Sequence, residues 1–188
     1  MTDHTIGNNP SIGNVLTNNK SGIVTASYAD DAVSKGQGFE IKKRITLTAN
    51  QTYYLVIDST ALVAANKGLF IQALIMSTGG GMVFVDTYAQ EGYTGGDAIV
   101  PLKLNTTKSQ VAECIFKKGV TPTGSVLSDT REYIVGTLST NQSSGGGGIG
   151  IDVSKQFSAG TKVFAKLVNQ ENANTYLNFG MVFFEAQF

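Results

Sequence analysis

From Phe39 to the C-terminus, short segments rich in β-branched and aromatic residues alternate with breaks rich in glycine and asparagine. The segments have the length and composition of β-strands, and the breaks carry turn-forming residues. About ten of them follow at roughly even spacing, without the alternating helices of a doubly wound fold. This pattern predicts an all-β sandwich or barrel. The segments are FEIKKRITLT, TYYLVID, GLFIQALIM, GMVFVDTYA, AIVPLKLN, QVAECIFKK, EYIVGTLS, GIGIDV, TKVFAKLVN and TYLNFGMVFFEAQF.

The breaks between these segments are predicted turns. They include the stretch from Gly92 to Gly96, the sequence GVTPTGS and the run NQSSGGGG. Glycine adopts positive φ without steric cost, and proline and asparagine favour turns for their own reasons. We therefore expect strands to end at these positions.

The last segment alternates most clearly. Large apolar side chains occupy every second position, and those that share one face are Leu177, Phe179, Met181 and Phe183. Because successive side chains of a strand point to opposite sides, this face is predicted to lie in the core.

One short segment, STALVAANKG, has helical character. Ser59 is a candidate N-cap, Leu62 and Val63 begin a short apolar stripe, and Gly68 would end the helix. We expect a single helical turn that links two strands.

The first 35 residues differ from the rest of the chain. They are rich in asparagine and glycine, and their isolated aliphatic residues form no stripe. Such a segment buries too little apolar surface to offset its ordering entropy, so residues 1–35 are predicted to be an extended arm. The sequence IVTASYADDAV could add a short strand or a helical turn, with Asp30 and Asp31 at a helix start. Residues 36–188 are the predicted sandwich domain.

Charge is low and balanced. Charged residues make up 15% of the chain, and its 14 basic and 14 acidic residues give a net charge of zero. A domain with little charge suits burial against neighbouring subunits, and a neutral one lacks the basic footprint of nucleic-acid binding. The basic runs Lys42-Lys43-Arg44 and Lys117-Lys118 are interpreted as solvated strand faces.

Catalytic signatures are scarce. The single cysteine, Cys114, lies in an apolar run and is interpreted as a buried inert thiol, and the single histidine, His4, lies in the arm. No apolar stretch approaches the length of a membrane span, and the N-terminus does not resemble a signal peptide. We expect a protein made in the cytoplasm that is not an enzyme, has no catalytic or metal-binding residues and uses no cofactor.

The run SSGGGGIGID, from Ser143 to Asp152, is the one apparent nucleotide-binding motif. A phosphate-binding loop needs Gly-Lys-Ser or Gly-Lys-Thr, which is missing, and a dinucleotide fingerprint needs a helix after the glycines. The sequence IGIDV that follows predicts a strand. The run is therefore interpreted as a hairpin connection.

Acidic and tyrosine side chains remain as weaker candidates. A carboxylate pair could form in space, but each candidate is expected to be solvated; these are Asp58, Asp86, Asp97, Glu113 and Glu132. Tyrosine faces stack on sugars, so Tyr53-Tyr54 and the pair Tyr88 and Tyr93 could line a glycan platform. Packing in a core or an interface is the preferred interpretation.

The sequence IVPLKLNTTKSQVAECIFKKGVTPTGSVLSDT resembles a segment of tailed-bacteriophage virion proteins. In these proteins a turn similar to KLNTT leads into a Thr/Ser-rich strand, then a turn similar to VTPTG, a Gly/Ser-rich loop and a strand ending near AGTKV. The resemblance covers roughly residues 99–188 and includes the closing strand YLNFGMVFFEAQF. It implies a jelly-roll-like antiparallel β-sandwich on the virion.

The resemblance also implies a function. We expect a head decoration or cement protein on the capsid surface, synthesised in the host cytoplasm, that contacts the major capsid protein and further copies of itself as a dimer or trimer. No nucleic-acid or membrane partner is expected. The alternative is a receptor- or carbohydrate-binding module of a phage head or tail fibre. An exposed aromatic cluster on loops bearing Tyr88, Tyr93 and Tyr133 would favour the alternative.

Overall fold

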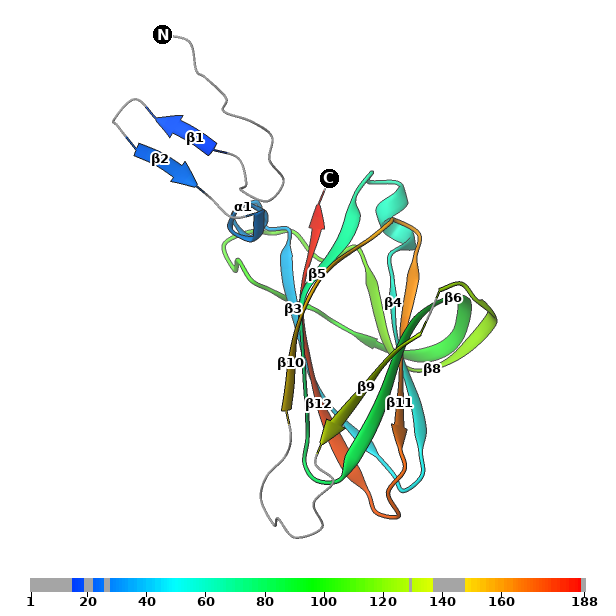
Figure 1. Cartoon of the computed structure of the whole chain (residues 1–188). Helices are drawn as coiled ribbons and strands as arrows, with labels where there is room; N and C mark the ends of the chain where they lie inside the picture. The colour runs from blue at the N-terminus through cyan, green and yellow to red at the C-terminus, as the bar shows by residue number, and fades with distance from the viewer. Residues whose placement is uncertain (1–14, 19–21, 26–27, 129, 137–147, 187–188) are drawn as a thin grey trace.

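A computed structural model describes residues 15–18, 22–25, 28–128, 130–136 and 148–186, with the backbone alone described up to residue 28 and over residues 148–155. Strands dominate this part of the chain (Figure 1). They are β1 (Val15–Asn18), β2 (Gly22–Thr25), β3 (Gly38–Leu47), β4 (Thr52–Asp58), β5 (Gly68–Thr78), β6 (Met82–Ile99), β7 (Leu102–Lys103), β8 (Ile115–Val126), β9 (Arg131–Gly136), β10 (Gly148–Phe157), β11 (Lys162–Asn169) and β12 (Thr175–Ala186). Among the described residues, neither α1 (Tyr28–Ser34) nor the 3-10 turn η1 (Thr60–Val63) could cross a membrane.

Eight of the strands pair as a rolled-up hairpin. The first pairs with the last, the second with the second last, and so on inward: β3 with β12, β4 with β11, β5 with β10, and β6 with β9. The pairings β12–β5 and β11–β6 then assemble two antiparallel sheets, β10-β5-β12-β3-β7 and β11-β4-β8-β6-β9. This is the topology of a jelly roll, so the predicted all-β sandwich is confirmed.

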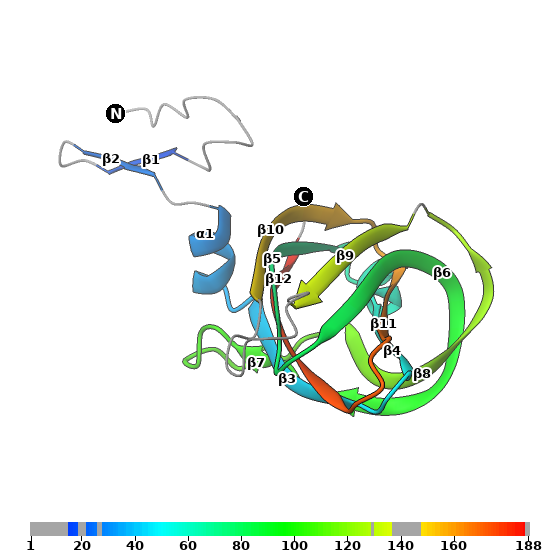
Figure 2. The same cartoon turned by 60° about the horizontal axis from the view of Figure 1, so that its bottom comes forward.

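The core lies between the inner faces of the two sheets (Figure 2). The predicted core face of β12 is confirmed, since the most exposed of its four apolar residues, Phe179, is only 8% exposed. The ring of Phe183 lies 5.5 Å from that of Phe39 and 4.7 Å from that of Phe116, measured between centroids. Because Phe116 belongs to the other sheet, Phe183 joins the two layers.

Two of the predicted breaks are wrong, because strands run through them. β6 continues through Gly92–Gly96, β8 continues through GVTPTGS, and the two segments pair, with Gly95 opposite Val120. Gly95 and Gly119 have φ of 69° and 67°. Here glycine bends a strand without ending its hydrogen-bonded ladder. The bent pair, residues 90–99 of β6 with β8, is termed the curl.

The curl encloses a second, smaller core on the outer side of its sheet. Val56, Val120 and Phe164 are buried there, and three partly buried tyrosines pack around them: Tyr54, Tyr88 and Tyr93. The second core exists because β8 also pairs with β4, which closes the curl back onto the sheet.

The N-terminal region contains local structure. β1 and β2 form an antiparallel hairpin and, within the described residues, pair only with each other. α1 follows, with Asp30 and Asp31 in its first turn, which confirms the expected helix start. Two strands of four residues make a hairpin that is marginal in water by itself.

The single helical turn expected in STALVAANKG is confirmed as η1, with Ser59 at its N-cap position, but the Ser59 side chain makes no capping hydrogen bond. The Ser59 hydroxyl instead donates to the carbonyl oxygen of Thr161 at 2.8 Å. The Oδ1 of Asp58, one residue earlier, accepts from the backbone N–H of Thr60 at 2.9 Å. The side chain that satisfies the first turn is therefore that of Asp58.

Most of the glycine run lies outside the described residues, which resume at Gly148. The strand predicted for GIGIDV is confirmed as β10, which pairs with β5 from Gly148 opposite Ser77. The run thus leads directly into a strand.

We expect removal of two glycines from Gly145–Gly148 to leave the fold nearly unchanged, because loop-closure entropy depends weakly on length. Chemical denaturation should give a free energy of unfolding within about 1 kcal/mol of wild type. ATP and NAD should leave the melting temperature of the intact chain unchanged. A nucleotide-dependent rise would contradict the interpretation of the run as a connection.

Candidate functional site: the root of the N-terminal arm

The five acidic candidates do not form one site. Four of them contact different side chains: Asp58 with Tyr93, Asp86 with Lys166, Asp97 with Lys118 and Glu113 with Lys67. Glu132 is exposed on β9, whereas Asp58 is buried, so the expectation that every candidate is solvated is wrong for Asp58. Among the described residues, no three metal-ligating side chains gather in one place.

The tyrosines are packed on strands. Tyr88 stacks on Phe164 with ring centroids 5.7 Å apart, and Tyr93 meets the same ring edge-on at 6.3 Å. Burial raises the pKa of Tyr88 and of Tyr93. Tyr133 packs against the main core. These three residues therefore do not form the exposed loop cluster that would favour a glycan-binding module.

A different group of elements meets where the arm joins the sandwich. α1 packs against β3 and β12, although the predicted boundary places it within the arm. The Nδ2 of Asn105 donates to the carbonyl oxygen of Val33 in α1 at 3.1 Å, and the backbone N–H of Leu104 donates to Gly38 at 3.0 Å. Residues 100–114 thus lie against the helix (Figure 2). α1 and residues 100–114 are together termed the arm root.

Close packing supports the arm root as one unit. A side chain at Gly38 would come within 3.2 Å of Val33, Phe184 and Leu104. A side chain at Gly36, whose φ is 76°, would collide with Lys108 and Gln110. Glycine is required at both positions, because the helix end and the connection approach so closely.

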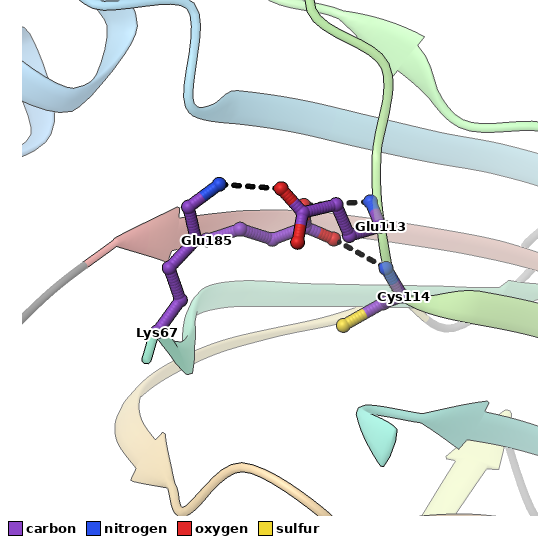
Figure 3. Close-up of polar contacts among 4 residues, drawn as sticks. All are labelled: Lys67, Glu113, Cys114 and Glu185. Carbon is purple, nitrogen blue, oxygen red and sulfur yellow. Dashed lines mark hydrogen bonds and ion pairs between the residues drawn. The ribbon is translucent and has the colours of Figure 1, made fainter. Parts of the chain in front are cut away.

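Glu185, near the end of β12, reaches across to the connection and anchors it (Figure 3). Its two carboxylate oxygens accept the backbone N–H groups of Glu113 and Cys114, each at 2.8 Å. The Lys67 ammonium pairs with the Glu113 carboxylate at 2.5 Å on the more exposed side. One buried carboxylate therefore satisfies two backbone donors just before β8 begins.

Burial also governs the titration of this cluster. It raises the pKa of Glu185, against the lowering effect of the two backbone N–H donors. Burial likewise raises the pKa of the Cys114 thiol, and the neighbouring Glu185 adds to that effect. Cys114 therefore stays protonated and unreactive at neutral pH, in agreement with its interpretation as an inert thiol.

The arm root exposes large apolar side chains even though its backbone is held firmly. Val100 is 79% exposed and Val111 is 71% exposed, and Leu102 of β7 is also exposed, as is Ile115 at the start of β8. Exposed apolar residues on a rigid frame are typical of surfaces that bind another protein.

Sequence reasoning missed the arm root because its contacts are long-range. The segments AIVPLKLN and QVAECIFKK were predicted as strands, but in the first only the end of β6 and β7 are strand, and in the second only the residues from Ile115 onward, so both predictions are wrong in part. The partner that holds residues 113 and 114 is Glu185, more than 70 positions away. A glutamate that follows the apolar run Met181–Phe184 in the closing strand was the one available signal.

Comparisons with known proteins give no family. No family model matches the sequence, and neither does any curated protein. A subviral particle of VP2 from infectious bursal disease virus aligns at 12% identity and a TM-score of 0.19, and the Gx strain of that virus at 12% and 0.13. The two alignments include 96% and 98% of the present chain. They include only 50% and 47% of those two viral chains, so the present chain spans about half of their length. TM-scores this low do not indicate a shared fold and carry no information about function.

Proposed function

We propose that this chain is a structural virion protein that decorates or cements a phage capsid. It acts by binding, without catalysis or a cofactor. Its contacts are made by the arm root together with residues 1–35. The observation that carries the proposal is the arm root itself, where a connection that is hydrogen-bonded to Val33 of α1 and to Glu185 of β12 exposes Val100 and Val111.

The fold and the arm agree with this role. Jelly rolls occur in viral capsid domains and also in lectins, so the fold alone does not choose between them. The β1–β2 hairpin pairs only with itself among the described residues, and so small a hairpin gains stability from a surface that it can pack on. The major capsid protein and a second copy of the chain are the proposed partners, in a dimer or trimer on the capsid surface.

Replacing Val100 and Val111 together with aspartate is expected to weaken attachment to the particle at least about tenfold, because two charges would then have to be desolvated in the contact. The melting temperature should stay near that of wild type, since both side chains are exposed. Imaging of particles with bound wild-type or variant protein, combined with a binding titration, measures both results.

Val63 offers a matched control for this test. It is 59% exposed on η1, outside the arm root, so Val63→Asp should bind as wild type does. Deletion of residues 1–27 should also weaken attachment while the sandwich stays folded. Full binding by both the double variant and the armless chain, or density confined to a tail tip, would overturn the proposal.

The alternative is a glycan- or receptor-binding module, for which the tyrosines that pack around the second core are the candidate residues. Tyr54, Tyr88 and Tyr93 gather around Phe164 in the curl, and the Lys117 ammonium lies 5.4 Å from the Tyr93 ring centre. One face of Tyr88 is already occupied by Phe164. Cell attachment that depends on Tyr93 and not on Val100 or Val111 would support this alternative.

A further inference from the structure

A cavity of about 80 Å³ lies between the two sheets. From the sheet that contains β12 it is lined by Leu74, Phe179 and Met181, and from the other sheet by Leu55, Val163 and Ala165. Leu74 and Phe179 are each 8% exposed, whereas Val83 and Val85, also on the inner faces, are fully buried. The space is therefore local to one part of the core.

The sequence of the inner face explains why space remains there. Ala165 of β11 lies opposite Leu55 on one side and Thr87 on the other, and Thr87 in turn lies opposite Arg131. Directly opposed residues of an antiparallel sheet share one face. The next residues along this face of β11 are Val163 and Leu167, so Ala165 and Thr87 leave a gap where larger side chains would fill the core.

The lining of the cavity is mixed. Thr87, Ser128 and Arg131 are part of it, Tyr88, Lys117 and Tyr133 also line it, and most of the remaining lining residues are aliphatic or phenyl side chains. Arg131 occupies an inner-face position of the edge strand β9, two residues before the core-packed Tyr133. No acidic side chain among the described residues forms an ion pair with Arg131 that would satisfy its guanidinium. An apolar space with a cation at its mouth suits an amphipathic anion.

We propose that this cavity binds a short aliphatic carboxylate, with its alkyl tail between the sheets and its carboxylate at Arg131. A water molecule occupies about 30 Å³ of liquid and needs two to four polar partners, which the apolar part of the lining around Leu55, Leu74 and Met181 does not offer. A methylene group is of similar size, so the cavity accommodates a tail of about three carbons. Guanidinium binds carboxylate through paired charge-assisted hydrogen bonds. Butyrate has this length and charge.

The test uses the full chain with butyrate as the probe. Butyrate is expected to raise the melting temperature in a saturable way and to shift the NMR signal of the Met181 methyl group. Hexanoate should bind more weakly because its tail exceeds the space, and n-butylamine should not bind, because its charge matches that of Arg131. Equal responses to butyrate and n-butylamine, or an unchanged Met181 signal, would overturn the proposal.

Two variants test separately the part of the cavity that would hold the alkyl tail (the tail site) and the contact of the carboxylate with Arg131 (the head site). Ala165→Leu fills the gap, so it should abolish the butyrate response. Arg131→Gln keeps the cavity and should weaken butyrate binding about tenfold while leaving binding of n-butanol unchanged. Unchanged butyrate affinity in Arg131→Gln would refute the head site. If Ala165→Leu fails to fold, the chain-length series on the wild-type protein decides the tail site, and binding that does not decline from butyrate to hexanoate refutes it.

Discussion

Replacement of Phe183 by alanine will lower the free energy of unfolding by about 3–5 kcal/mol, a large part of the stability of a domain this size. The side chain is fully buried and contacts Phe39 within its own sheet and Phe116 in the other. Its removal deletes apolar contacts and leaves a cavity where the two layers meet. Urea denaturation followed by fluorescence or circular dichroism measures the loss.

Ile75 provides the matched control for Phe183. It lies on β5 in the same sheet, but it is 56% exposed on the outer face, opposite Gly180. Ile75→Ala should therefore change the free energy of unfolding by no more than about 0.5 kcal/mol. Similar losses in the two variants would mean that the assigned inner and outer faces of the sheet are wrong.

Replacement of Glu185 by alanine is expected to lower the free energy of unfolding by about 2–4 kcal/mol, because two backbone N–H groups lose their acceptors. Glu185 is 2% exposed, and the N–H of Cys114 that it accepts is buried. Amide hydrogens of residues 113 and 114 should also exchange faster in the variant. Glu113→Ala is the control and should lose less than about 1 kcal/mol, since its ion pair with Lys67 is partly solvated.

The pH dependence of this effect has a definite sign. Burial raises the pKa of Glu185, so the folded protein keeps a proton that the unfolded chain releases above about pH 4. The stabilisation from this proton is fully present below the unfolded pKa and is lost as the pH rises through the folded pKa. The difference in stability between wild type and Glu185→Ala should therefore decrease as the pH rises from about 4. A difference that grows over this range would contradict the assigned direction.

Local patterns were sufficient to predict the sandwich. The alternation in β12 identified its buried face, because burial of one sheet face imposes a period of two on the sequence. The same local reasoning failed at Gly92–Gly96 and at GVTPTGS, where each strand continues because the other pairs with it. A glycine's conformational freedom permits a turn, but the partner strand decides whether the ladder continues.

The arm root shows the limit of reasoning from sequence more clearly. Nothing near residues 113 and 114 shows that their N–H groups bond to Glu185, and a buried glutamate cannot be told from an exposed one by its neighbours. Asp58 is a similar case, since its burial depends on Tyr93 from the curl. Polar groups are placed by tertiary partners, whereas apolar periodicity is a local signal.

The pairing of β3 with β12 fixes when this chain can fold during its synthesis. β12 lies between β3 and β5, so neither strand has this central neighbour until β12 itself has been synthesised. Contacts between distant parts of a chain form slowly and leave strand edges open in the meantime. Products truncated before residue 175 lack β12, so we expect them to leave the edges of β3 and β5 unpaired and to aggregate.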